Sequence, residues 1–188
     1  MKKTAVALLF CGASAFATTI TFSTTATFSG PDADNAGTTL TSGGSTIKFA
    51  GMTGETVDAP SGIDIGAIDL TSTGSGDFQA GDMITLEFDQ TSPSVGIATT
   101  ESPLTGTVQT TSSGLVLDFT NQTLMIGEAT YILDASYPLL APNVDAGAGL
   151  GKTALFAEVT APEPASVGLL GASMFGLGLL FRRRGQKQ

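Results

Sequence analysis

Apolar and polar residues alternate with a period of two along most of the central chain, as in strands with one buried face. Ile20, Phe22 and Phe28 share one parity of the segment 20–28, and serine and threonine fill the other. The pattern predicts strands at 20–28, 47–49, 63–70, 84–89, 107–109, 115–119, 124–126, 130–133 and 154–159. We therefore expect an all-β fold, an antiparallel β-sandwich of about eight or nine strands with jelly-roll-like or Ig-like connections.

Two local features add detail to this fold. The alternation within 63–70 changes phase near Gly66, which predicts a β-bulge there. Ser112-Ser113-Gly114 separates 107–109 from 115–119, which predicts a hairpin that pairs these two strands.

The N-terminus has the pattern of a secretory signal peptide. Two lysines precede the apolar stretch Ala5–Phe16, which has 12 residues and is too short to cross a bilayer of roughly 30 Å. Ala15 and Ala17 fit the small-x-small rule of signal peptidase, so Thr18 is the predicted first residue of the mature protein.

Cys11 is the only cysteine, and it lies inside this peptide. A lipoprotein acylation site is one interpretation, but bulky Phe10 stands where a small residue is needed. The other interpretation is a filler residue in a discarded peptide. The mature chain then has neither a disulfide nor a thiol nucleophile.

The C-terminal tail differs abruptly from the central chain. It contains three parts in order: Pro162-Glu163-Pro164, an uncharged stretch of 17 residues at 165–181, and the cluster Arg182, Arg183 and Arg184. As a helix the stretch covers roughly 25 Å, a marginal membrane span. The arginines would hold its end in the cytoplasm.

This order of parts resembles the PEP-CTERM sorting domain over Ala161–Arg184. The resemblance implies processing by an exosortase, a membrane cysteine transpeptidase of Gram-negative bacteria that make exopolysaccharide, with the Pro-Glu-Pro triplet as the recognition element. It also implies a protein that is transiently in the inner membrane and then at the cell surface or extracellular. We expect a signal peptide at 1–17, a β-domain at 18–160 and a sorting signal at 161–188, with transmembrane helix 165–181 and Arg-rich end 182–188.

The predicted helix has one face of small residues. Gly168, Ala172 and Gly176 are spaced at i, i+4 and i+8, which lets another helix approach closely. Docking to a membrane enzyme is one interpretation of this face, and a generic glycine-rich segment is the other.

The region between Thr18 and Thr160 is strongly acidic. It holds two lysines and 16 acidic residues, and 2 − 16 gives a formal charge of −14. Such a domain repels phosphate backbones and anionic membrane surfaces, so no nucleic-acid partner is expected. The same region has 27 threonines and 13 serines, a composition typical of secreted surface proteins.

A second resemblance concerns the central region at Ile63–Asp89. The run Asp-Ile-Gly-Ala-Ile-Asp-Leu, then Ala80-Gly81-Asp82, then an alternating strand resembles the choice-of-anchor β-domains that often precede this kind of tail. The resemblance implies no established activity.

Residues 146–153 fit a loose phosphate-binding loop, with Lys152 and Thr153 at its end. That chemistry needs a buried strand before the loop and a helix after it. Only eight residues separate Thr153 from Pro162, so a glycine-rich turn before the last strand is the favoured interpretation.

Asp32, Asp34 and Asn35 resemble the opening of a calcium loop. An EF-hand is excluded, because its twelfth position is Gly43 where a bidentate glutamate is required. A looser calcium site is one alternative, and a solvated turn is the other.

The residue content excludes several catalytic sites. The chain has no histidine, which removes Ser-His-Asp triads and ordinary zinc sites. Its acids show no spacing that pairs two of them for glycoside hydrolysis. We expect no enzyme activity and no cofactor apart from the calcium alternative.

We expect an exported structural or adhesive protein in an exopolysaccharide or biofilm context, with signal peptidase and exosortase as partners during export. The alternative is a carbohydrate-binding module that contacts extracellular polysaccharide, and a secreted hydrolase is less favoured. The chain lacks tryptophan, and Tyr131 and Tyr137 are its only tyrosines, so a flat aromatic platform for sugars is not expected.

Overall fold

The computed structural model describes residues 17–142 and 151–162, within a compact unit from Thr18 to Pro162. All strand pairs in this part are antiparallel and none of its residues is helical, which confirms the expected all-β, antiparallel class. The strands are more numerous than expected, and most of the predicted segments extend further: β1 Thr18–Ser29, β2 Thr39–Ser42, β3 Ser45–Ala50, β4 Glu55–Ala59, β5 Ser61–Ser72, β6 Gly76–Phe78, β7 Met83–Ser92, β8 Gly96–Pro103, β9 Gly106–Gln109, β10 Ser112–Ser113, β11 Val116–Leu117, β12 Thr123–Ile126, β13 Ala129–Leu133, β14 Tyr137–Pro138 and β15 Lys152–Thr160.

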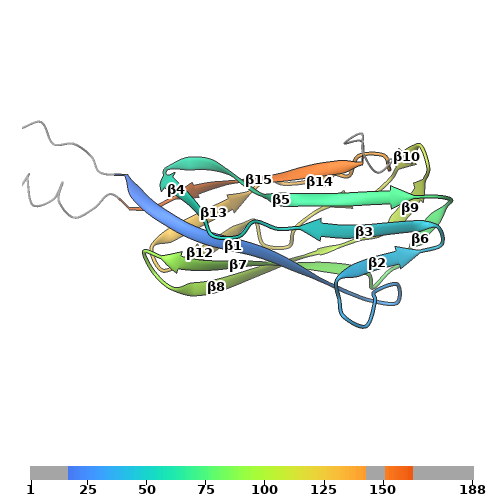
Figure 1. Cartoon of the computed structure of the whole chain (residues 1–188), viewed down its shortest axis with the longest axis horizontal. Coiled ribbons are helices and arrows are strands. Elements are labelled where there is room, and N and C mark those ends of the chain that lie inside the picture. Colours follow the sequence, from blue (N-terminus) through green and yellow to red (C-terminus); the bar gives the residue numbers. More distant parts are fainter. Residues whose placement is uncertain (1–16, 143–150, 163–188) are drawn as a thin grey trace, which may run out of the picture. The chain divides into compact units, whose positions relative to one another are not determined.

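Two large sheets and two smaller ones, of three strands (β10-β9-β6) and two strands (β11-β14), surround one hydrophobic core (Figure 1). The four-strand sheet has the order β4-β1-β7-β8, and the six-strand sheet has the order β12-β13-β15-β5-β3-β2. Alternate residues of each strand point into the core, as the period of two predicts. The fully buried members from both sheets include Ile20, Ile47, Ile65, Ile84, Leu86, Phe88 and Leu155.

The bulge predicted near Gly66 is confirmed. The register between β15 and β5 shifts between Leu155 and Phe156, which lie opposite Gly66 and Asp64, so Ile65 is the extra residue. Gly66 has a φ of 121°, a conformation that a side chain would strain. Its N–H donates to Oδ1 of Asp64 at 2.9 Å, so the bulge fixes this exposed carboxylate.

The predicted hairpin around Ser112 is wrong in its pairing. Strand β10 at Ser112–Ser113 is itself the partner of β9, and β11 pairs with β14 instead. The predicted parity of 115–119 is nevertheless confirmed, since Leu115, Leu117 and Phe119 are buried. These residues therefore fill the core without pairing with β9.

The two ends of the domain lie at the same end of the sheets (Figure 1). Thr18 pairs with Ala59 at the end of β4, and Val159 pairs with Ser61 at the start of β5. Pro60 alone separates β4 from β5, so the start of β1 and the end of β15 pair with residues on the two sides of this one-residue connection.

The predicted helix 165–181 and the arginine cluster 182–184 lie outside the described residues, as does the signal peptide up to residue 16. In the part of the chain that is described, no helix is long and apolar enough to cross a membrane.

Candidate functional site

The end of strand β15 is the point where the folded domain meets the Pro-Glu-Pro triplet. Thr160, the last strand residue, pairs with Thr130 of β13. Ala161 packs against the hydrophobic core, and Pro162 is exposed. Glu163 and Pro164 lie outside the described residues. A single residue therefore separates the last paired residue of the fold from the triplet.

This junction is rigid on its domain side. Strand β15 lies between β13 and β5, and it contributes buried Leu155 and Val159 to the core. A central strand of a packed sheet is among the last parts of a domain to open. Any enzyme that handles the triplet must therefore work directly beside a folded sheet.

The structure does not bring the three calcium candidates together, because Asp34 and Asp32 have different hydrogen-bond partners. The carboxylate of Asp34 accepts hydrogen bonds within its own loop, from N and Oγ1 of Thr38, both at 2.7 Å, and from N of Thr39 at 3.2 Å. The bond from the Thr38 hydroxyl is the main reason that the pKa of Asp34 falls to about 2. Asn35 is exposed in the same loop.

Asp32 instead lies beside Asp82, a residue that the sequence analysis named only in the choice-of-anchor resemblance and not as a site residue. Asp82 is fully buried, and its carboxylate accepts hydrogen bonds from the backbone N–H of Asp32 at 3.1 Å and of Gln79 at 2.8 Å. Oδ2 of Asp32 is buried and has no hydrogen-bond partner among the described residues. Burial raises the pKa of Asp32, and the negative charge of Asp82 raises it further.

The Asp32–Asp82 pair belongs to no larger group of acidic side chains among the described residues. Within residues 17–142 and 151–162, no three Asp, Glu, His or Cys residues are grouped so that they could hold a metal ion. The pair instead couples the β1–β2 loop to the start of β7, because Asp82 holds the backbone of Asp32.

We predict that Asp32→Asn stabilises the domain by about 1 kcal/mol at pH 7, because it removes a charge held beside Asp82. The pKa of Asp32 is higher in the folded state than its ordinary 3.8, so the folded state binds this proton more tightly. The resulting stability is present below pH 3.8 and is lost as pH rises through the folded pKa. The gain from the substitution should therefore disappear in acid. Urea unfolding of a fragment covering 18–162, followed by circular dichroism at pH 7 and pH 3, measures it.

The matched control is Asp118→Asn, which changes an exposed aspartate on another part of the domain. This control should alter stability by less than about 0.5 kcal/mol at either pH. A gain for Asp32→Asn that is equal at both pH values would contradict the electrostatic explanation.

The residues after the glycine-rich segment form a strand, whereas a phosphate-binding loop is followed by a helix. Lys152 begins strand β15, where that chemistry requires a helix. The hydroxyl of Thr153 accepts a hydrogen bond from N of Leu140 at 2.9 Å, so it is engaged within the fold. Residues 146–150 lie outside the described residues.

Comparison with known proteins identifies the tail. A family described as the PEP-CTERM protein-sorting motif matches residues 160–184, which begin at the last residue of β15 and include the triplet and the arginine cluster. No curated protein and no solved structure matches the chain. The chain carries a PEP-CTERM protein-sorting motif, which implies an exported protein that an exosortase recognises and that reaches the cell surface of a Gram-negative bacterium.

Proposed function

We propose that the β-domain is a structural or adhesive component of the cell surface or extracellular matrix. In this proposal, signal peptidase cleaves after Ala17, exosortase processes the tail, and the β-sandwich is the part that is displayed. The observation that carries the proposal is the position of the sorting motif. The motif match begins at Thr160, where the last core strand ends, so sorting delivers the folded domain with almost no linker.

The protected edge of the four-strand sheet supports this role. Edge strand β8 is covered by the segment before β12. Oγ1 of Thr100 donates to the carbonyl of Asn121 at 2.8 Å, and N of Asp118 donates to Oγ of Ser102 at 2.7 Å. Covered edges prevent uncontrolled strand pairing between copies. A protein displayed at high local concentration needs this protection.

The surface charge supports the same role. The region 18–160 has a formal charge of −14, from two lysines and 16 acids, and most of these acids are exposed or half-buried. Mutual repulsion keeps such domains soluble and separate, and it disfavours adsorption to anionic membrane surfaces. The domain is therefore suited to a hydrated matrix outside the cell. The proposal assigns it no catalytic activity.

A domain exchange in the producing bacterium tests the proposal. In a strain that lacks the gene, we would express the full chain or a chain in which an unrelated exported domain replaces 18–160, with both targeting ends kept. Both chains should be sorted, and only the full chain should restore the shear resistance of the surface-attached cell layer. If the gene deletion leaves shear resistance unchanged, or if both chains restore it, the structural role of the β-domain is rejected.

A further inference from the structure

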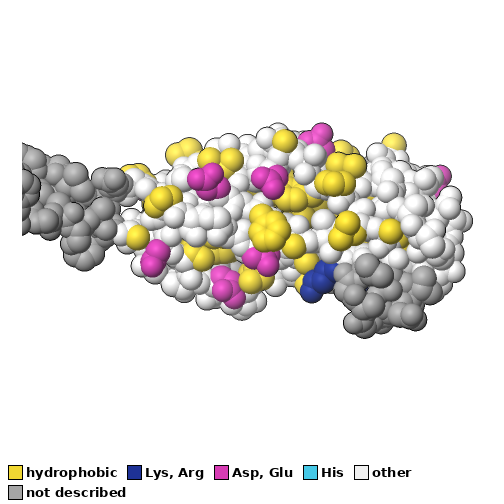
Figure 2. All heavy atoms as spheres, turned by 90° about the horizontal axis from the view of Figure 1, so that it is seen from above, with side chains coloured by type: hydrophobic (Ala, Val, Ile, Leu, Met, Phe, Trp, Pro, Cys, Tyr) yellow, Lys and Arg dark blue, Asp and Glu magenta, His cyan; other side chains and the backbone are white. Residues whose placement is uncertain are grey.

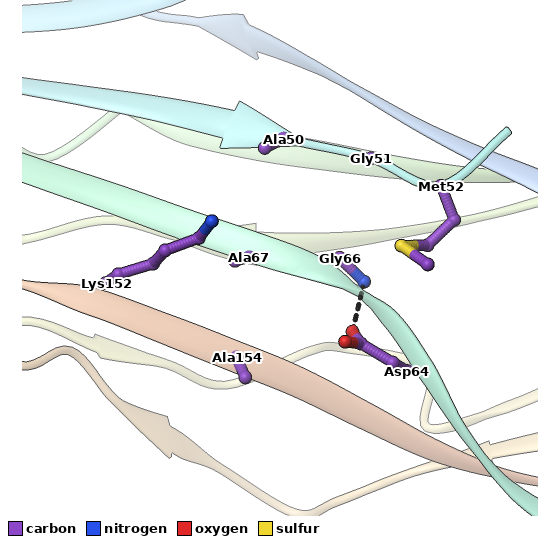
Figure 3. A pocket seen from close by; sticks show the side chains of 8 residues that line it. All are labelled: Ala50, Gly51, Met52, Asp64, Gly66, Ala67, Lys152 and Ala154. Carbon is purple, nitrogen blue, oxygen red and sulfur yellow. Dashed lines mark hydrogen bonds between the residues drawn. The ribbon is translucent and has the colours of Figure 1, made fainter. Parts of the chain in front are cut away.

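A shallow groove crosses the outer face of the six-strand sheet. Its floor is a row of three alanines from neighbouring strands, in which Ala50 of β3 pairs with Ala67 of β5, and Ala67 pairs with Ala154 of β15. Gly51 and Gly66 extend the floor, and the depression has a volume of about 380 Å³ (Figure 3). Small residues on three adjacent strands leave a trough roughly 10 Å long across the sheet.

A row of charged residues borders one side of the floor. Lys48 pairs with Asp69, and Asp69 pairs with Lys152, on the same outer face and two residues from the alanine row. These lysines are the only two basic residues between Thr18 and Thr160. Figure 3 shows the side chain of Lys152 extending from β15 across β5, towards Ala67. Lys152 therefore lines the groove, and the other basic residue, Lys48, lies on the far side of Asp69 in the same row.

Asp64 lines the other side of the groove, and Phe156 lies next to it on the same outer face. They pair across β15 and β5, directly beside Ala154 and the bulge. Phe156 is 52% exposed, although a phenylalanine is normally buried in a core of this size. The N–H of Gly66 holds one oxygen of Asp64, so the aspartate is oriented by the bulge (Figure 3).

Hydrophobic and acidic side chains are interspersed on this side of the domain. Figure 2 views the molecule from above, the side on which β15 and β5 lie in Figure 1, and shows basic side chains at one place among them. This mixture does not resemble a continuous apolar patch of the kind that marks a protein interface. It instead places one aromatic ring beside several separate polar groups.

We propose that this groove binds a short stretch of a neutral polysaccharide chain. A sugar ring offers an apolar face of C–H groups to an aromatic ring such as Phe156, and a rim of hydroxyls to charged groups. Lysine ammonium groups donate hydrogen bonds and aspartate carboxylates accept them, and a hydroxyl can partner both kinds. The alanine floor leaves room for a ring between the two walls.

Charge decides between kinds of polysaccharide. The charged residues that line the groove, Lys152 and Asp64, carry one charge of each sign, and the neighbouring Lys48 and Asp69 add one of each, so this surface favours no net charge in the ligand. The domain as a whole, at −14 over 18–160, repels an anionic polymer. A neutral chain is not repelled by the acidic domain, and it matches the balanced charges around the groove. The inference rests on the proposed matrix role and names the polymer class that the domain would hold.

Native affinity electrophoresis of the full chain in mild detergent tests the groove. The gels would contain dextran, galactomannan or hydroxyethyl cellulose as neutral polymers, and alginate as an anionic one. At least one neutral polymer should slow the protein, and alginate should not. Phe156→Ala should weaken the retardation about tenfold in apparent Kd, the loss of one aromatic contact. Ala154→Gln, which fills the exposed floor, should also weaken it.

The matched control is Ile97→Ala, which removes another exposed apolar side chain, from β8 of the other sheet. It should be retarded like the unchanged protein. No retardation by any neutral polymer, retardation by alginate alone, or equal retardation of all variants would overturn the groove. If no polysaccharide binding is found but the chain with the exchanged domain still fails to restore shear resistance, the groove proposal is rejected and the matrix role is kept. If the protein binds a neutral polymer but the exchanged chain restores shear resistance as well as the full chain does, only the matrix role is rejected.

Discussion

Replacement of Pro162, Glu163 and Pro164 by alanine is expected to stop processing and leave the full-length chain in the membrane fraction. Prolines favour an extended backbone in the residues before them, and the first proline of the triplet follows the last paired strand residue by only two positions. Three alanines would favour helix instead, so the predicted membrane helix could continue outward towards Ala161. The triplet would then no longer present an extended segment. Immunoblots of membrane, cell-surface and medium fractions would report the size and location of the protein.

The matched control is Glu158→Ala, which removes an exposed acidic side chain from strand β15 shortly before the motif. This variant should be processed and released normally. Unchanged processing of the triple-alanine variant would show that the tail is only an anchor. Pro162 is exposed, so its replacement removes no core residue, and circular dichroism of both variants checks that the β-domain stays folded.

The strands that the sequence predicts are those whose inward residues are apolar. Strand β1 shows this, since Ile20, Phe22 and Phe28 all point into the core. Strand β8 was not predicted, because its buried inward residues are Thr100 and Ser102. Their hydroxyls bind backbone groups of the segment that covers the edge, so polar residues occupy both faces. A period of two in hydrophobicity cannot reveal such a strand.

The groove could not be predicted for a different reason. Ala50, Ala67 and Ala154 come from three separate segments, and they form one floor only because β5 lies between β3 and β15. Strand order and register are tertiary properties, which local alternation does not contain. The bulge at Gly66 was predictable because a change of parity is local. The orientation of Asp64 that results from it required the structure.

The pair of Asp32 and buried Asp82 was missed for the same reason. Asp32 and Asp82 are 50 residues apart, and the hydrogen bond from the Asp32 backbone brings them together. The local motif around Asp32 instead favoured Asp34 as its partner, but the threonines after Asp34 engage that carboxylate. Competition from nearby hydroxyl and N–H donors therefore decides which acids are left to interact with each other.

Tyr131→Ala is expected to lower the free energy of unfolding by about 4 kcal/mol. The ring of Tyr131 is fully buried and belongs to β13 of the six-strand sheet. It contacts Phe22 and Phe88 of the four-strand sheet, with ring centroids 5.9 Å and 5.0 Å away. Its removal opens a cavity at the contact between the sheets. Since single domains are stable by only about 5–15 kcal/mol, this is a large share.

Urea unfolding of the fragment 18–162, followed by circular dichroism, measures this loss. Met125→Ala is the matched control, because Met125 is 68% exposed on the adjacent strand β12. It should change stability by less than about 0.5 kcal/mol. A similar loss for both substitutions would contradict the proposed contact between the sheets.

The hydroxyl of Tyr131 has a separate role, which Tyr131→Phe isolates. It donates to Oε1 of Gln90 at 2.7 Å, and Nε2 of Gln90 donates to the carbonyl of Ser94 at 2.9 Å. Without the hydroxyl, the amide oxygen of a fully buried glutamine loses its partner, so stability should fall by about 1–3 kcal/mol. An unchanged stability would mean that the hydrogen bond contributes nothing to holding the β7–β8 turn against the core.

The same hydroxyl makes stability depend on alkaline pH. Burial raises the pKa of Tyr131 from its ordinary 10.0 to about 12. The folded state therefore keeps a proton that the unfolded state releases, and stability is lost as pH rises from 10 towards 12. Because the chain has two tyrosines and no tryptophan, phenolate absorbance follows Tyr131 and Tyr137 alone. Burial also raises the pKa of Tyr137 to about 12, so neither phenolate should appear near pH 10.5 while the domain is folded. Phenolate signal at that pH without loss of the circular dichroism spectrum would show that the tyrosines are open to solvent.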